Sequence, residues 1–134
     1  MSTRIAALAT ALLLGACAPQ PAPSCATPLK PAVEVDLFFG RNIEGGGRVS
    51  DAEWSDFLAA EVTPRFPDGF TALEASGQYR EPSGAITREP SKLVVIVVFD
   101  TPDFRAKVSA LVDVYRKRFR QHDVLRLERP VCAG

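Results

Sequence analysis

The hydrophobic and polar residues of this chain alternate along one stretch and recur at helical spacing along two others. Residues 33–39, VEVDLFF, place an apolar side chain at every second position, which predicts a half-buried strand. Residues 92–99, KLVVIVVF, contain seven consecutive apolar residues, which predicts a central strand buried on both faces. Residues 69–80 and 123–132 predict two further strands.

Two segments have the start signals and the apolar spacing of helices. Ser50 and Glu53 form a capping box, and the Thr-Pro pair at residues 63–64 predicts the end of that first helix. Thr101 is the expected N-cap of the second helix, with Pro102 at its first position. The apolar stripe of the second helix comprises Phe104, Val108, Leu111, Val112, Tyr115 and Phe119.

The order of these elements is strand, helix, strand, strand, helix, strand. Residues 81–84, EPSG, predict the turn of a hairpin between the second and third strands, and Pro90 predicts a bulge in the third. This order predicts an α+β fold of the ferredoxin-like βαββαβ type. The expected four-stranded antiparallel sheet has the order 4-1-3-2, with both helices on one face.

The sheet face away from the helices is expected to carry an exposed apolar patch. Its expected apolar members are Phe38, Val94, Ile96 and Val98, and its expected border is Glu34, Asp36, Arg126 and Glu128. Because exposed apolar patches usually contact a partner, we expect a homodimer formed through this open sheet face.

The N-terminus has the pattern of an export signal. Arg4 precedes the apolar residues 5–16, a run too short to span a bilayer permanently. The following Leu-Gly-Ala-Cys resembles the bacterial lipobox, which implies that residues 1–16 are a lipoprotein signal peptide and that Cys17 receives a lipid. A plain secreted protein with a chance cysteine is the alternative.

The resemblance to a lipobox also implies a location in the cell. Several acyl chains hold a protein on a membrane far more firmly than one. Ala18 stands where an aspartate usually signals retention in the inner membrane of Gram-negative bacteria. We therefore expect a lipid-anchored protein of the bacterial cell envelope, on the outer membrane facing the periplasm. Residues 17–31 are rich in proline and predict an extended tether, and residues 32–134 predict a single domain.

The charge balance argues against nucleic-acid binding. The 134 residues include 16 Lys and Arg and 16 Asp and Glu, and removing residues 1–16 takes away only Arg4. Nucleic-acid binding requires a clear basic excess, so no nucleic-acid partner is expected.

The two remaining cysteines are expected to form a disulfide. In the predicted topology Cys132 closes the last strand beside the start of the first, and Cys25 lies seven residues before the first strand. An oxidising compartment favours a bridge between them. Two free thiols or a metal site are the alternatives, but metal-ligand spacing is absent and neither a metal nor a cofactor is expected.

One end of the predicted sheet collects a rim of basic and polar residues. The segment EGGGRVS, residues 44–50, offers backbone N–H groups beside arginine side chains, which together could hold a small anion. Interspersed carboxylates allow the simpler interpretation of a solvated charged edge. The candidate anion-binding residues are Arg41, Arg48, Tyr79, Arg88, Ser91 and Lys92.

No catalytic residues are assigned, because no serine has a histidine and a carboxylate nearby in a triad pattern. The leading hypothesis is a non-catalytic binding or interaction module for an unknown protein or a small anion. The alternative is a small enzyme of the dimeric α/β-barrel type that acts on an anionic small molecule, with Arg41, Tyr79, Arg88 and Glu89 lining its pocket.

Several segments together resemble one known family. They are LFFGR at 37–41, VSDAEWSDFLAAEVTPRFPDGFT at 49–71, REPSKLV at 88–94 and YRKRFRQHDVLRL at 115–127. They resemble the small exported bacterial proteins of domain-of-unknown-function family 3574. The resemblance implies a compact α+β domain and brings no activity, substrate or cofactor. His122-Asp123 stands where the family resemblance leads us to expect a polar pair such as Glu-Ser, which counts against a shared catalytic role for that histidine.

Overall fold

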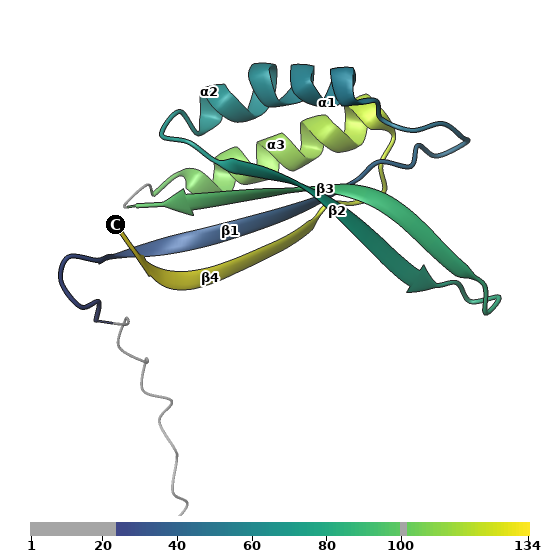
Figure 1. Ribbon diagram of the computed structural model, residues 1–134. Helices are drawn as coiled ribbons and strands as arrows, with labels where there is room; N and C mark the ends of the chain where they lie inside the picture. Colours follow the sequence, from purple (N-terminus) through teal and green to yellow (C-terminus); the bar gives the residue numbers. More distant parts are fainter. Residues whose placement is uncertain (1–23, 100–101) are drawn as a thin grey trace, which may run out of the picture.

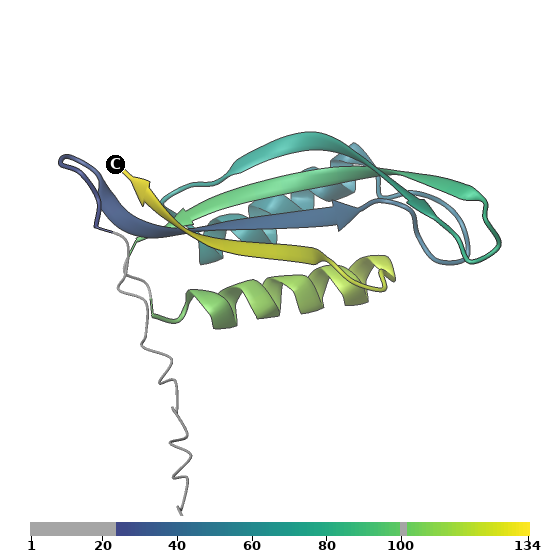
Figure 2. The same cartoon turned by 90° about the horizontal axis from the view of Figure 1, so that it is seen from below.

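The computed structural model describes residues 24–99 and 102–134, so the predicted signal peptide, Cys17 and most of the tether lie outside the described residues. The elements in chain order are β1 (Lys30–Gly40), α1 (Asp51–Phe57), η1 (Leu58–Val62), α2 (Thr63–Arg65), β2 (Thr71–Arg80), β3 (Ile86–Val98), α3 (Phe104–Phe119) and β4 (Leu125–Ala133). All neighbouring strands are antiparallel, in the order β2-β3-β1-β4, and the helices cover one face of the sheet (Figures 1 and 2). The predicted βαββαβ fold is confirmed.

The first helix begins at its predicted cap but continues past its predicted end. The Ser50 side chain accepts from the Glu53 backbone N–H, and the Glu53 carboxylate accepts from the Ser50 N–H. We expected the Thr-Pro pair at 63–64 to end the helix, but the helical backbone continues to Arg65. The reason is that η1 is a π-helical segment, in which the Thr63 N–H donates to Leu58 O. This wider turn accommodates the proline ring, which clashes in an ordinary α-helical turn.

The second helix begins later than predicted. Pro102 precedes α3, whose first residue is Phe104, and Asp103 stands at the N-cap without a side-chain capping bond. Thr101, the expected cap, lies outside the described residues. At the other end Arg120 adopts a left-handed conformation with φ 47°, which turns the chain toward β4.

The predicted bulge at Pro90 is absent, and β3 pairs with β2 in one continuous register from Ile86 to Val95. The reason lies at the end of β1. The Arg41 N–H donates to Pro90 O at 3.1 Å, but proline has no N–H to return the bond. The Arg41 carbonyl instead accepts from the Val49 N–H at 2.9 Å. Pro90 therefore marks the point where β1 leaves the sheet.

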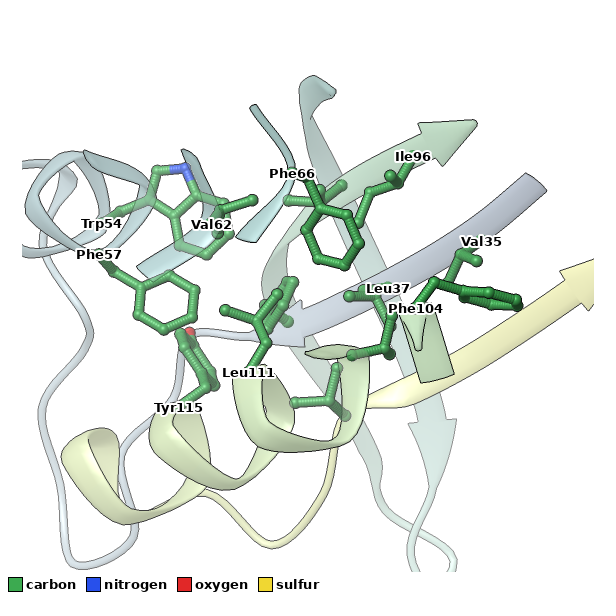
Figure 3. Packing of buried hydrophobic residues seen from close by; sticks show 14 of the residues in the cluster. Val35, Leu37, Trp54, Phe57, Val62, Phe66, Ile96, Phe104, Leu111 and Tyr115 are labelled. Carbon is green, nitrogen blue, oxygen red and sulfur yellow. The ribbon is translucent and has the colours of Figure 1, made fainter. Parts of the chain in front are cut away.

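Aromatic side chains fill the layer between the sheet and the helices (Figure 3). The Phe39 ring lies 4.7 Å from the ring of Tyr115 and 5.3 Å from that of Trp54, measured between centroids. The Tyr115 hydroxyl donates to Gly40 O at 2.8 Å, which ties α3 to the end of β1. Burial raises the pKa of the Tyr115 phenol, so this hydroxyl stays protonated and remains a donor at neutral pH.

The pairing register corrects the expected faces of β3 and β4. Val94 lies opposite Leu37, and Ile96 opposite Val35, so these residues of β3 face the helices and are buried. The expectation that Val94, Ile96 and Val98 lie on the open face is therefore wrong. Arg126 and Glu128 also face the helices, where Glu128 pairs with Arg105 of α3 at 2.9 Å. The open face instead carries Leu93, Val95, Val97, Leu125 and Leu127.

A disulfide joins the two ends of the described chain. Cys25 and Cys132 are bonded, as we expected, with their Cα atoms 5.6 Å apart. Lys30 and Pro31, expected in the tether, belong to β1, because β4 continues to Ala133 and gives them pairing partners. The C-terminus and the start of β1 consequently lie side by side in Figures 1 and 2.

Candidate functional site

The predicted basic rim contains two residues that are buried in an ionic cluster. The Arg41 Nε atom donates to Val49 O at 2.8 Å, and its NH2 atom lies 3.1 Å from Asp51 Oδ1. The Lys92 Nζ atom donates to the same Asp51 oxygen at 2.9 Å and also to Glu74. Each cation of this cluster therefore already has a carboxylate partner within the chain.

The titration of the ionic cluster follows from these contacts. The hydrogen bond from Lys92, assisted by the charge of Arg41, lowers the pKa of Asp51. Burial opposes the charge of Lys92, but its hydrogen bonds to Glu74 and Asp51 outweigh burial and leave its pKa raised. The cluster holds the start of α1 against the sheet with its charges balanced, and it offers a free anion little attraction.

Acidification should weaken this cluster. Because the folded-state pKa of Asp51 lies below its usual 3.8, its contribution is fully present above about pH 4 and is lost as the pH falls through the lowered value. We expect Asp51→Asn to reduce stability at pH 7 and to make the unfolding midpoint fall less steeply between about pH 4 and pH 2.

The Asp51 experiment measures urea midpoints across pH for the unsubstituted chain, Asp51→Asn and Asp56→Asn. Asp56 is an exposed aspartate on the same helix and serves as the matched control. An acid profile of Asp51→Asn that superimposes on that of Asp56→Asn would show that the cluster contributes nothing specific.

The other four candidate anion-binding residues lie apart from this cluster. Arg48 and Arg88 are exposed, the former in the loop before α1 and the latter on β3. Ser91 is buried on the open-face side and its hydroxyl donates to Glu89 O at 3.3 Å. Tyr79 is exposed near the end of β2, and its pKa is raised, mainly by the negative charge of Glu81. The six residues do not converge on one point.

A hollow of about 590 Å³ opens where β1 ends, between the β2–β3 hairpin and the loop that leads into β4. Tyr79 and Glu89 line it, and His122 and Asp123 border it from the loop, but Arg41 and Arg88 do not. The hollow thus contains two of the four residues expected in an enzyme pocket. Its carboxylates make it less suited to an anion than the sequence led us to expect.

The position of Glu89 in this hollow depends on Gly40. Glu89 Oε1 accepts from the Asn42 backbone N–H at 3.2 Å, which holds its side chain across the end of β1. A Cβ atom at position 40 would lie 2.5 Å from Glu89 Oε1, so any larger residue would displace the carboxylate. Gln121 closes the loop side by donating to Asn42 O at 2.7 Å. Sequence reasoning gave no signal for this Gln121 contact.

The open sheet face carries a continuous row of large apolar side chains. Leu73 of β2 lies opposite Leu93 of β3, which lies opposite Phe38 of β1, which lies opposite Leu125 of β4. The row therefore crosses all four strands. Its two ends are the most accessible, with Leu73 47% exposed and Leu125 60% exposed. The pairing register, and not the residue pattern, reveals this row.

Asp36 lies in the next row, between Val95 and Leu127. Although it is on the open face, it is only 6% exposed. Its Oδ2 atom accepts from Arg129 at 3.0 Å, and Arg129 also pairs with Glu34. Within the described ranges, Asp36 Oδ1 is the one buried side-chain oxygen or nitrogen without a hydrogen-bond partner. A carboxylate oxygen in that state has a substantial energetic cost.

Neither a metal centre nor a membrane span emerges from residues 24–99 and 102–134. In these ranges no three His, Cys, Asp or Glu side chains are grouped so that they could hold a metal ion. Within the same ranges, no helix has the length and apolar character needed to cross a membrane.

Comparison with known proteins identifies a family and a fold. The family model described as "Protein of unknown function (DUF3574)" matches residues 34–134. No curated protein matches the chain in sequence. A phage SAM lyase in complex with S-methyl-5'-thioadenosine is similar in structure, with a TM-score of 0.58 and 20% identity over 77% of this chain and 89% of that one.

Two further solved structures show the same likeness. The phage SAM lyase in the apo state has a TM-score of 0.59 and 19% identity, over 83% of this chain and 92% of that one. CutA from Synechococcus elongatus has a TM-score of 0.52 and 14% identity, over 80% of this chain and 86% of that one. At these identities the likeness shows the ferredoxin-type fold alone.

Proposed function

Because the chain belongs to the DUF3574 family, whose function is unknown, we propose a function from its surfaces: a lipid-anchored, non-catalytic binding module of the bacterial envelope. Its open sheet face is the binding surface. The observation that carries this proposal is the apolar row from Leu73 to Leu125, which crosses the whole sheet and has no helix over it. Contiguous apolar surface of this kind is characteristic of interaction sites.

The basic rim supports this choice of surface indirectly. Its two buried cations, Arg41 and Lys92, are paired with Asp51 and Glu74 and hold the fold together. A small anion would have to rely on exposed residues such as Arg48 and Arg88, and single exposed ion pairs contribute only about 0 to 1 kcal/mol. The open face therefore supports a binding function better than the rim does.

Anchoring through Cys17 completes the proposal, with the N-terminal pattern as its support. The disulfide at Cys25 and Cys132 fixes the point where the tether meets the domain. The extended tether that the sequence predicts between Cys17 and Cys25 would reach about 20 Å at roughly 3.1 Å per residue. The domain would therefore stand clear of the lipid with its open face available.

The experiment uses the full chain in bacterial cells, with a photo-crosslinking amino acid at one position. Leu127 on the open face and Ala110 on the exposed side of α3 are the two positions compared. We expect adducts from position 127 and few from position 110. We also expect Cys17→Ser to move the protein from the membrane fraction to the soluble fraction and to abolish palmitate labelling.

The two parts of this experiment test the binding surface and the lipid anchor independently. Equal adduct yields at positions 127 and 110, or none at either, would contradict the open face as the binding surface. Retention of Cys17→Ser in the membrane fraction would contradict lipid anchoring at that cysteine and leave the binding surface unaffected.

The second candidate function is a small enzyme that uses the hollow at the end of β1. Its specific support is that Tyr79 and Glu89 both line that hollow, together with the fold shared with a phage SAM lyase. Calorimetric titration with S-methyl-5'-thioadenosine and with inorganic phosphate separates the two candidates. Saturable binding of S-methyl-5'-thioadenosine that Glu89→Gln weakens would favour the enzyme over the module, whereas the same substitution should strengthen any binding of phosphate, because it removes a negative charge.

A further inference from the structure

We propose that the open sheet face binds the same face of a second copy of this chain. The inference rests on the proposed function, because it names the partner of the surface described above. Three features support it: the apolar row, the exposed Arg129 beside Glu34, and the projecting β2–β3 hairpin.

The face that carries the apolar row is large enough for a protein–protein interface. Four strands at a spacing of about 4.8 Å and strands of 9 to 13 residues give the face a footprint of roughly 600 to 700 Å². A standard protein–protein interface buries about 800 Å² on each partner. Two such faces together are therefore close to the size of a stable interface, and pairing covers Leu73, Leu93 and Leu125 at once.

The charged groups of the open face indicate what kind of partner fits. The Arg129 side chain is 55% exposed and pairs with Glu34 of the neighbouring strand. A purely apolar occupant, such as lipid, would remove water from this guanidinium without supplying an acceptor, at a substantial energetic cost. A second copy supplies an acceptor, since its own Glu34 lies on the same face and a guanidinium has five N–H donors.

Self-pairing uses this complementarity twice. A two-fold axis places the same surface on both partners, so one face supplies both the acceptor and the donor. Glu34 and Asp36 are the carboxylates of this face that pair with Arg129. Arginine from each copy would therefore meet acidic groups of the other, where charge-assisted hydrogen bonds are strongest.

The β2–β3 hairpin extends beyond the rest of the sheet. β1 pairs with β3 only as far as Ser91, and beyond the Arg41 bond to Pro90 O the backbone of residues 86–89 pairs with β2 alone. In Figure 1 this two-stranded segment bends away from the helices, toward the side of the open face. Isolated two-stranded segments are only marginally stable in water. A second copy seated on the open face would support the hairpin along its exposed Tyr79 side.

Co-purification of two differently tagged full-length copies from the same cells tests the inference. The test variant carries Leu73→Lys and Leu125→Lys in both copies, on edge strands where the exposed leucines contribute little to the core. The matched control carries Leu29→Lys, a leucine 39% exposed before β1 and away from the row. Circular dichroism and the thermal midpoint verify that all three proteins fold.

We expect the second tag to be recovered with the first for the unsubstituted and control chains. Recovery should fall about tenfold or more in the double variant, because lysines on both faces would be buried without partners. All three proteins share the anchor, so residence in one detergent micelle affects them equally. Arg129→Gln should lower recovery by a smaller factor.

Two results would overturn the inference. One is absence of the second tag with the unsubstituted chain, and the other is equal recovery for the double variant and the control. If the copies do not co-purify but position 127 forms adducts with a different envelope protein, the second copy is the wrong partner and the binding module stands. If position 127 also forms no adducts, both proposals fail.

Discussion

Replacing Cys25 and Cys132 together by serine is expected to destabilise the domain by about 4 to 5 kcal/mol. The bridge joins residues 107 positions apart, and closing a loop of about 100 residues is worth close to that amount in the chain-entropy model. Equilibrium unfolding in urea measures the loss. Both proteins carry Cys17→Ser, so that no lipid is attached. The thermal midpoint should fall by at least about 15 °C.

Reduction of the unsubstituted protein provides the control for this result. Dithiothreitol should lower its stability to that of the double serine variant and leave the variant itself unchanged. A loss below about 1 kcal/mol in the variant would contradict the chain-entropy account of this bridge.

Phe39→Ala is expected to have the second largest effect, a loss of about 3 to 5 kcal/mol. Phe39 is fully buried at the centre of the aromatic layer, and its ring contacts those of Trp54, Phe57 and Tyr115. Removing it leaves a cavity bordered by rigid rings from two helices, which have little freedom to move inward. Urea unfolding is again the measurement.

Phe39→Leu is the graded control, because it keeps most of the buried volume. It should cost about 1.5 kcal/mol or less. If the alanine and leucine variants lose the same amount of stability, the aromatic layer around Phe39 is not packed as tightly as its ring distances indicate.

The residue pattern was sufficient for the order and type of the elements. The alternation of residues 33–39 fixes which side of the first strand is buried, and Val35, Leu37 and Phe39 are all fully buried. The capping box at Ser50 gives the start of the first helix. These signals are local, since they depend on residues within one turn or one strand. For that reason they are readable without knowledge of the fold.

The helix ends and the bulge were beyond local reasoning for a different reason. A proline normally stops a helix or disrupts a strand, because it lacks an N–H. Here the π-helical segment before Pro64 accommodates the proline ring, and because β1 leaves the sheet at Pro90, no N–H is needed at that position. In both cases a neighbouring segment changed the consequence of the proline.

The candidate site shows the same division between local and distant information. The sequence identified Arg41 and Lys92 as basic residues at one end of the sheet, but their partner Asp51 lies 41 positions before Lys92. Packing of α1 against the sheet brings these charges together. A basic residue that appears available in the sequence is therefore neutralised within the fold.

The sequence by itself determined the βαββαβ order, the inward side of the first strand and the proximity of Cys25 to Cys132, because hydrophobic periodicity and right-handed connections permit few other arrangements. Only the tertiary structure decided which residues of β3 and β4 form the open face. A run of seven apolar residues has no period of two, so pairing of Val94 with Leu37 set the orientation of β3. Leu125 and Leu127 lie on the open face, because the register of β4 on β1 places Arg126 and Glu128 against the helices.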